Sequence, residues 1–493
     1  MTRDPARSAL LTDLYQLTMA LGYWAGGRAE REAAFHLYFR SPPFGGYTVA
    51  CGLDAAADYL ETFRFEADEL AYLATLEDAE GRALFPGPFL DYLGGLRLAL
   101  DVDMAAEGAV VFANEPLVRV RGPILHAQLV ETALLTHVGF STLVATKAAR
   151  VALAARGDEV LEFGLRRAQG PDGGLAASRA AYVGGCAATS NVLAGMRYGI
   201  PVRGTHAHSW VMSFDSEPEA FAAYAEALPG NCVFLVDTYD TLEGVRRAAE
   251  AGRALRARGH RLLGVRLDSG DLAYLSRAAR RILDEAGFPD AKVLASNDLD
   301  EHLIESLKQQ GAAVAVWGVG TKLVTSYDRP ALGCVYKLTA MRDAGGAWRP
   351  RVKVSEQAAK TTTPGVLQVR RYRGGDGRLA GDMLVDELEP FALGADGSAV
   401  MVDPLDPTRR KRFAAGASWE PLLEPVFARG DRVRPAAPLE RARARVRADL
   451  AALPEGATRL ANPHSYPVGL ERGLYERKTA LVLAARGVEG NAA

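Results

Sequence analysis

The chain has 493 residues, which at roughly 150 residues per domain corresponds to two to four domains and excludes a single small module. Apolar residues make up 48% and charged residues 24%, so the composition excludes general disorder and fibrous or collagenous architectures. The 58 Lys and Arg nearly balance the 60 Asp and Glu, which predicts neither a nucleic-acid partner nor an anionic membrane surface. Anion binding is therefore expected only in a local pocket.

The spacing of the cysteines and the length of the apolar runs indicate the cellular compartment of the protein. Neither a C-x-x-C pair nor a metal-ligand spacing occurs among the four cysteines, which favours a reducing cytoplasm; they are Cys51, Cys186, Cys232 and Cys334. No run reaches 18 apolar residues, and the first residues mix Arg and Asp around a short apolar patch. Neither a membrane span nor a secretory signal is expected, so we predict a cytoplasmic protein.

Residues 1–140 are predicted to form an N-terminal α+β domain. The segment TDLYQLTMALGYW (12–24) is typical of a helix, and AAFHLYFR (33–40) and YTVACGL (47–53) are typical of extended strands.

Residues 141–345 are predicted to form a β/α barrel. Short apolar runs alternate with polar or glycine-rich turns and helical stretches, which indicates parallel strands joined by right-handed crossovers. The GxGxxG fingerprint of a dinucleotide-binding domain is absent after the first of these strands, which favours a barrel over an open sheet. The seven predicted strands are VLEFG (160–164), IPVRGT (200–205), CVFLVD (232–237), RLLGVRLD (261–268), KVLAS (292–296), VAVWGVG (314–320) and LGCVYKL (332–338).

Residues 346–493 are predicted to form a C-terminal domain. Glycine and proline interrupt short extended pieces such as LQVRRYRG (367–374) and SAVMVDP (398–404). The charged segment PLERARARVRADLAALP (438–454) is typical of a solvated surface helix.

The chemistry of a β/α barrel lies at the C-terminal ends of its strands. Here these ends carry many groups that bind anions and hydroxyls. The turn GVGTK (318–322) offers unobstructed backbone N–H groups, a hydroxyl and an ammonium, a combination that suits a phosphate. Arg266 and Asp268 share one side of a strand, where Arg266 can grip a carboxylate or phosphate and Asp268 can accept from ribose hydroxyls or hold magnesium. A simple salt bridge between the two is the alternative.

The pair His206-x-His208 follows Gly204 and Thr205 at a predicted strand end. One interpretation is a metal-dependent barrel hydrolase, but the later strand ends supply no further histidine. The other is a nucleophilic histidine that accepts a phosphoryl group, with Asp237 or Asp240 orienting its second ring nitrogen.

Several long motifs occur together in one order, and with them the chain resembles the nicotinate phosphoribosyltransferases from about residue 9 to about residue 480. The motifs are TDLYQLTMA, EFGLRRAQGPDGG, GTHAHSW, GVRLDSGDL, SNDLDE, GVGTKLVT, LGCVYKL and LANPHSYPVGLE. The resemblance implies an irregular β/α barrel with flanking domains, of the type II phosphoribosyltransferase kind. It also implies an ATP-coupled reaction in which nicotinate and phosphoribosyl pyrophosphate give nicotinate mononucleotide and pyrophosphate, with Mg²⁺ and a homodimer that shares its active sites.

The resemblance further assigns roles to residues of this sequence. It implies that His208 is transiently phosphorylated, while His206 is a packing or supporting residue. Nicotinate would contact Thr205 and Arg266, and Tyr15 of the partner subunit would stack on its ring. The remaining assignments concern phosphoribosyl pyrophosphate and its phosphates: Arg166, Asp268, Gly320 and Thr321, with Arg167, Asn297 and Lys322 as neighbours.

Two rivals stay open beside the metal-dependent hydrolase. A sibling enzyme would use nicotinamide, whose amide needs an acceptor as well as donors, whereas full-length motif agreement favours the acid. A non-catalytic nucleotide sensor on the same barrel is the other rival, although His208, Arg266 and Asp268 are all present.

Overall fold

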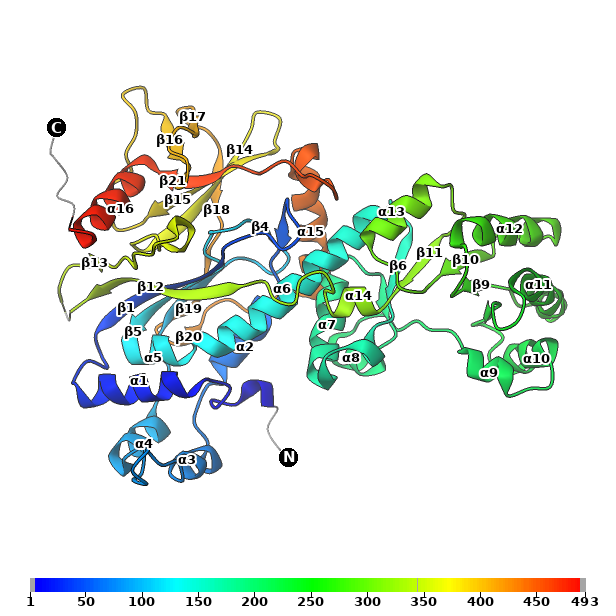
Figure 1. Ribbon diagram of the computed structural model, residues 1–493, viewed down its shortest axis with the longest axis horizontal. Coiled ribbons are helices and arrows are strands. Elements are labelled where there is room, and N and C mark those ends of the chain that lie inside the picture. The colour runs from blue at the N-terminus through cyan, green and yellow to red at the C-terminus, as the bar shows by residue number, and fades with distance from the viewer. Residues whose placement is uncertain (1–4, 344, 488–493) are drawn as a thin grey trace. The chain divides into compact units, whose positions relative to one another are not determined.

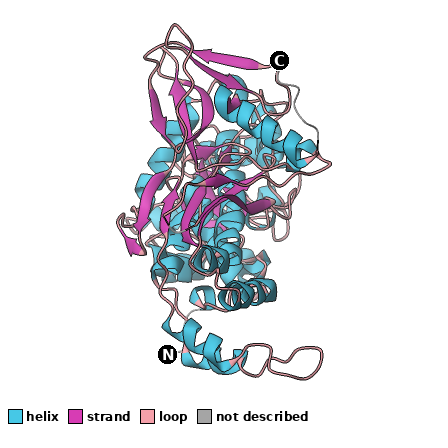
Figure 2. Ribbon diagram, turned by 90° about the vertical axis from the view of Figure 1, so that its left-hand side faces the viewer, coloured by secondary structure: helices cyan, strands magenta, loops and turns pink. Residues whose placement is uncertain are grey.

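The computed structural model describes residues 5–343 and 345–487 (Figures 1 and 2). The chain forms two compact units. Unit 1 combines residues Met1–Thr142 with Ala331–Ala493, and unit 2 spans Leu143–Pro330. The division of the chain into domains at 1–140, 141–345 and 346–493 stays a prediction.

Unit 2 contains a six-stranded parallel sheet in the order β7-β6-β11-β10-β9-β8. Its strands alternate with helices along the chain, as the sequence predicts for a β/α barrel (Figure 1). The strands are β6 (Glu159–Glu162), β7 (Ala188–Thr189), β8 (Val233–Leu235), β9 (Gly264–Leu267), β10 (Lys292–Ala295) and β11 (Val316–Val319). The helices are α7 (Gly170–Gly184), α8 (Val192–Tyr198), α9 (His208–Met212), α10 (Glu217–Ala227), α11 (Thr241–Ala257), α12 (Leu272–Glu285), α13 (Glu301–Gln309) and α14 (Thr321–Val324).

Capping residues in the sequence mark the ends of α11 in unit 2. The Asp240 side chain accepts the Glu243 N–H at the start of α11, and Gly259, at φ 80°, follows its end. Gly244 lets α11 approach β8 closely, because a Cβ there would lie 2.1 Å from the Val236 carbonyl oxygen. One apolar cluster on the parallel strands consists of Leu161, Ala188, Leu294 and Val316, with Phe163 and Ala187 packed against it.

Two of the seven predicted barrel strands are wrong. Residues 200–205 are mostly exposed and make only a single bridge, between Val202 and Thr189, and the short strand β7 supplies the sheet edge instead. Residues 332–338 fall within β12 (Cys334–Arg342), which pairs antiparallel with β1 (Glu32–Phe39) in unit 1. An apolar run shows that a strand is buried, but it does not identify its partner.

Unit 1 is built mainly on two mixed or antiparallel sheets. Their strand orders are β13-β12-β1-β5-β3-β19-β20 and β17-β16-β21-β15-β14-β18, and β2 and β4 form a separate pair. The remaining strands are β2 (Thr48–Val49), β3 (Asp101–Met104), β4 (Val110–Val111), β5 (Val118–Pro123), β13 (Arg349–Pro350), β14 (Leu367–Arg373), β15 (Leu379–Asp386), β16 (Ala399–Val402), β17 (Arg410–Phe413), β18 (Trp419–Pro421), β19 (Glu424–Ala428), β20 (Asp431–Arg432) and β21 (Val468–Glu471).

The predicted N-terminal helix is α1 (Leu14–Ala25), and the charged segment near the C-terminus is α15 (Leu439–Ala452), which buries only a narrow stripe of side chains. The other helices of unit 1 are α2 (Leu53–Glu61), α3 (Ala67–Leu73), α4 (Gly87–Gly95), α5 (Ile124–Leu129) and α16 (Arg472–Ala485), and α6 (Glu131–Ala154) crosses the boundary between the units. Within the described ranges, every helix is too short or too polar to span a bilayer.

Candidate active site

Polar side chains gather where β8 and β9 end in unit 2. His208 begins the short helix α9, and its Nδ1 lies 3.1 Å from the Thr238 Oγ1. Its Nε2 lies 3.9 Å from an oxygen of Asp237 and 3.9 Å from an oxygen of Asp268. The imidazole is half-exposed, so one ring nitrogen is held by a hydroxyl while the other faces two carboxylates and remains reachable by a ligand.

Asp237 is the most enclosed carboxylate of this group, with its side chain 1% exposed. Its Oδ2 accepts the backbone N–H of Asp268 at 2.9 Å and the hydroxyl of Ser269 at 2.6 Å. Its Oδ1 is buried and accepts no hydrogen bond from any described residue. Such an atom is costly unless a ligand or ion completes it, which marks Asp237 as part of a binding site.

Arg266 lies on β9, and its Nη1 donates a hydrogen bond to the Thr205 Oγ1 at 2.6 Å. Burial lowers the pKa of Arg266, and the nearby charge of Arg166 acts in the same direction, while Asp268 and Asp237 oppose it. The Arg266 Nε is buried and donates to no described residue. A guanidinium with an unused donor at a strand end is well suited to an anionic ligand.

Asp268 and Arg166 complete this cluster from two different loops. Asp268 follows β9 and accepts a hydrogen bond from the Ser296 hydroxyl, which holds the carboxylate across the ends of β9 and β10. Arg166 is exposed in the one-turn segment Leu165–Arg167 after β6. The structure therefore places His208, Thr205, Arg266 and Asp268 in one cluster, with Arg166 near enough to act electrostatically on Arg266.

His206 has a different environment from His208. Its Nε2 accepts the backbone N–H of Leu235 at 3.2 Å, and its ring packs among Phe221, Tyr224 and Phe234. Burial lowers the pKa of His206 to about 4, so the ring is neutral at physiological pH. The H-x-H pair therefore divides into one packed ring and one ring that faces the carboxylates, which argues against two histidines that jointly bind a metal.

The turn after β11 contains Gly320 and Thr321. It packs tightly against the loop after β6, because a Cβ at Gly164 would lie 2.3 Å from Val324 and 3.0 Å from the Gly320 carbonyl oxygen. Lys322, at the same turn, pairs with Asp300 at 2.6 Å. Asn297, after β10, has φ 126°, a strained backbone conformation that non-glycine residues adopt mainly at functional sites.

Several acidic residues after strands cap helices instead of facing the cluster. The side chains of Asp240, Asp271 and Asp300 accept the N–H groups of Glu243, Tyr274 and Leu303. Of the two candidates for orienting His208, Asp240 is thus engaged as a cap, whereas Asp237 faces the histidine. Tyr15 belongs to unit 1, on α1, where it is 46% exposed; burial and the nearby Glu131 raise the pKa of its hydroxyl.

Two side chains near the strand ends received no role from the sequence, which named Thr238 only among the polar residues after a strand and Phe163 only within a motif. Phe163 is a partly buried ring beside Gly318, where a Cβ would lie 2.8 Å from that ring. Thr238 holds His208, as described above. The aromatic residue next to a glycine after a strand is a weak signal for a flat ligand, and a lone threonine gives none.

The fold and the strand-end groups define an irregular β/α barrel of the type II phosphoribosyltransferase class. Family models of nicotinate phosphoribosyltransferase match the chain in three parts: the N-terminal domain at residues 10–139, the family region at 159–364 and the C-terminal domain at 367–478. The chain belongs to the nicotinate phosphoribosyltransferase family.

Individual relatives agree with this assignment over nearly the whole chain. The nicotinate phosphoribosyltransferase of Bacillus subtilis is 44% identical, with 95% of this chain and 94% of that protein covered. The Bos taurus nicotinate phosphoribosyltransferase is 38% identical, with 98% of both chains covered. The crystal structure of human nicotinic acid phosphoribosyltransferase is 33% identical, with a TM-score of 0.82 over 95% of this chain and 99% of that one.

Proposed function

We propose that this enzyme transfers the 5-phosphoribosyl group from phosphoribosyl pyrophosphate to nicotinate, giving nicotinate mononucleotide and pyrophosphate, with ATP hydrolysis coupled to the transfer. The observation that carries the proposal is the cluster at the ends of β8 and β9. There His208 faces two carboxylates, and Arg266 with Thr205 presents donors for an anionic substrate. Family membership supplies the identity of the substrates.

The cluster suits a reaction that needs no general base. The pyridine nitrogen of nicotinate already holds a free lone pair at neutral pH, so it attacks the anomeric carbon directly as pyrophosphate leaves. Positive charge then develops on the ribose, and the site must hold the anionic phosphates while it orients the two reactants. The arginines and hydroxyls of the cluster do this, which accounts for anion-binding groups in place of an acid and base pair.

His208 is the phosphoryl acceptor in this proposal. When Nδ1 carries the ring proton and donates it to the Thr238 oxygen, Nε2 retains the lone pair that attacks the terminal phosphorus of ATP. The nitrogen–phosphorus bond forms as the bond from phosphorus to the ADP oxygen breaks, and ADP leaves. Water later takes the phosphoryl group from His208 and regenerates the imidazole. Asp237 and Asp268, 3.9 Å from Nε2, favour the positively charged ring that this attack creates.

Arg266 and Thr205 bind the nicotinate carboxylate in this proposal. Arg266 has a free buried Nε, and its Nη1 is fixed by Thr205, so the planar guanidinium is pre-oriented toward a carboxylate. The ring of Phe163 offers an apolar surface for a flat pyridine. Tyr15, lent by the partner subunit of a homodimer in the cytoplasm, covers the other face of the pyridine.

Arg166, Asp268, Gly320 and Thr321 bind phosphoribosyl pyrophosphate in this proposal. Mg²⁺ fits the same place, because the buried Asp237 Oδ1 accepts no hydrogen bond from a described residue and a hard cation prefers carboxylate oxygens together with substrate phosphates. Asp237 and Asp268 would hold the ion, which neutralises phosphate charge when bound. Among the described residues, no three His, Cys, Asp or Glu side chains are arranged so that they could hold a metal ion by themselves, so an ion here would take most of its ligands from phosphates and water.

Product analysis tests the proposal. Purified enzyme is incubated with phosphoribosyl pyrophosphate and Mg²⁺, with nicotinate or nicotinamide, and with or without ATP. We expect nicotinate mononucleotide and pyrophosphate, at a rate that ATP increases. Efficient turnover of nicotinamide alone would assign the sibling activity, and no product from either pyridine would favour a non-catalytic sensor.

A further inference from the structure

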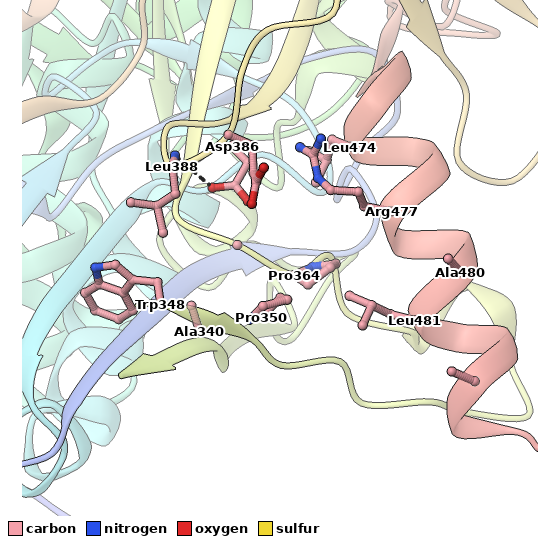
Figure 3. Close-up of a pocket in the computed structure, with 13 residues that line it drawn as sticks. Ala340, Trp348, Pro350, Pro364, Asp386, Leu388, Leu474, Arg477, Ala480 and Leu481 are labelled. Atoms are coloured by element: carbon pink, nitrogen blue, oxygen red, sulfur yellow. Dashed lines mark hydrogen bonds between the residues drawn. The ribbon is translucent and has the colours of Figure 1, made fainter. Parts of the chain in front are cut away.

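A cavity of about 390 Å³ lies in unit 1, and its lining includes no residue of the candidate site. Its walls come from the region of β12 and β13, from the turn after β15, and from α16 (Figure 3). Most of the wall is apolar, with Trp348, Pro350, Leu388 and Leu481 among the lining side chains. The volume lies in the range of small-molecule sites, which are usually apolar with a few polar groups that fix the ligand's orientation.

Asp386 supplies one of these polar groups. One carboxylate oxygen, Oδ1, accepts the backbone N–H groups of Val366 at 3.0 Å and Leu388 at 3.2 Å. The other oxygen, Oδ2, accepts no hydrogen bond from a described residue. Gly365 leaves the space for it, because a Cβ there would lie 2.2 Å from Oδ2, and the backbone at φ 106° favours glycine. Burial raises the pKa of Asp386, and Arg477 opposes this shift.

Arg477 supplies the opposite charge from α16, across the cavity from the strand side (Figure 3). Within residues 5–343 and 345–487, no carboxylate lies within ion-pair distance of the Arg477 guanidinium. This holds for the carboxylate of Asp386 too. An arginine and a carboxylate that are both half-buried in one cavity would normally form an ion pair. Here each keeps free hydrogen-bonding capacity toward the space between the apolar walls.

We propose that this cavity binds a zwitterionic amino acid with an apolar side chain. The ligand's carboxylate pairs with Arg477, its ammonium pairs with Asp386, and its side chain packs against Trp348, Leu388 and Leu481. The orientation of the Trp348 ring is fixed because the guanidinium of Arg342 stacks on it, 5.0 Å from the ring centroid. The charges of the lining explain the choice, because a purely anionic ligand would be repelled by the carboxylates of Asp386 and Glu389, and a purely cationic ligand would be repelled by Arg477.

Calorimetric titration of the full-length protein tests this proposal, with L-phenylalanine and L-leucine as probes. The matched analogues 3-phenylpropanoate and 2-phenylethylamine lack the ammonium and the carboxylate respectively. We expect at least one of the two amino acids to bind, and each analogue to bind about 10-fold or more weakly than L-phenylalanine where the latter binds. Arg477→Gln should weaken amino-acid binding by a similar factor, and Ala480→Trp should block the cavity.

Controls separate this site from the candidate active site and from a loss of folding. Arg472→Gln removes a cation from the same helix but outside the cavity lining, and it should bind as the wild type does. The thermal unfolding midpoint of each variant without ligand shows whether it is folded. The proposal is overturned if neither amino acid binds at millimolar concentration, if Arg477→Gln binds like the wild type, or if nicotinate displaces the bound amino acid.

Discussion

The Thr238 hydroxyl lies 3.1 Å from the Nδ1 of His208, at the opposite side of the ring from the nitrogen that faces Asp237 and Asp268. A hydrogen bond at one imidazole nitrogen fixes which tautomer is present and therefore which nitrogen keeps its lone pair. The geometry links a threonine after β8 to the reactivity of a histidine that begins α9.

Thr238→Val should slow phosphorylation of His208 by about 10-fold, because valine keeps the shape of threonine and removes the hydrogen bond. The initial rate of phosphate transfer from labelled ATP to the protein measures this effect. Thr238→Ser retains a hydroxyl and should recover most of the rate. Equal rates for the valine variant and the wild type would show that Thr238 does not position the ring.

His208→Ala should abolish phosphate labelling by ATP and remove the acceleration of nicotinate turnover that ATP provides. Labelling is measured on acid-sensitive phosphate bound to the protein, and turnover by product formation with and without ATP. His302→Ala is the matched control, since His302 is an exposed histidine of the same unit whose ring is 56% exposed, and it should label normally. Label that persists on the His208 variant contradicts the assignment.

Arg266→Lys should lower kcat/KM for nicotinate by about 10- to 100-fold, because a point charge replaces a planar fork that Thr205 holds in place. Steady-state kinetics with varied nicotinate gives the ratio. A circular dichroism spectrum like that of the wild type is the control for folding. An unchanged kcat/KM would remove Arg266 from the nicotinate site.

The barrel could be predicted from sequence because its strands and helices alternate along the chain. Five of the predicted strands overlap strands of the parallel sheet, but Val202 makes only a bridge and β12 pairs with β1, since pairing depends on distant residues. The candidate site was predictable as a set of polar residues at the C-terminal ends of strands. Sequence alone did not separate Asp237, which faces His208, from Asp240, which caps α11, because both follow the same strand.

The two histidines of the H-x-H pair illustrate the same limit. His206 and His208 are equivalent in the sequence pattern, yet one ring is surrounded by aromatic side chains and the other faces carboxylates. The aromatic side chains around His206 come from α10 and β8. These elements are distant in sequence from residue 206, so a local sequence pattern does not reveal them.

His206 should make the stability of unit 2 depend on pH. Its pKa is about 4 in the folded chain and about 6.5 as an ordinary histidine, so between about pH 4 and pH 6.5 the unfolded state binds a proton that the folded state does not. The stabilising contribution of the neutral ring is present above pH 6.5 and is lost progressively as pH falls toward 4. His206→Gln cannot gain a charge in this range, so its unfolding midpoint should fall less steeply between pH 6.5 and 4 than that of the wild type. Thermal unfolding of both proteins across this range provides the comparison, and parallel curves would show that the His206 ring is protonated equally in the folded and unfolded chain.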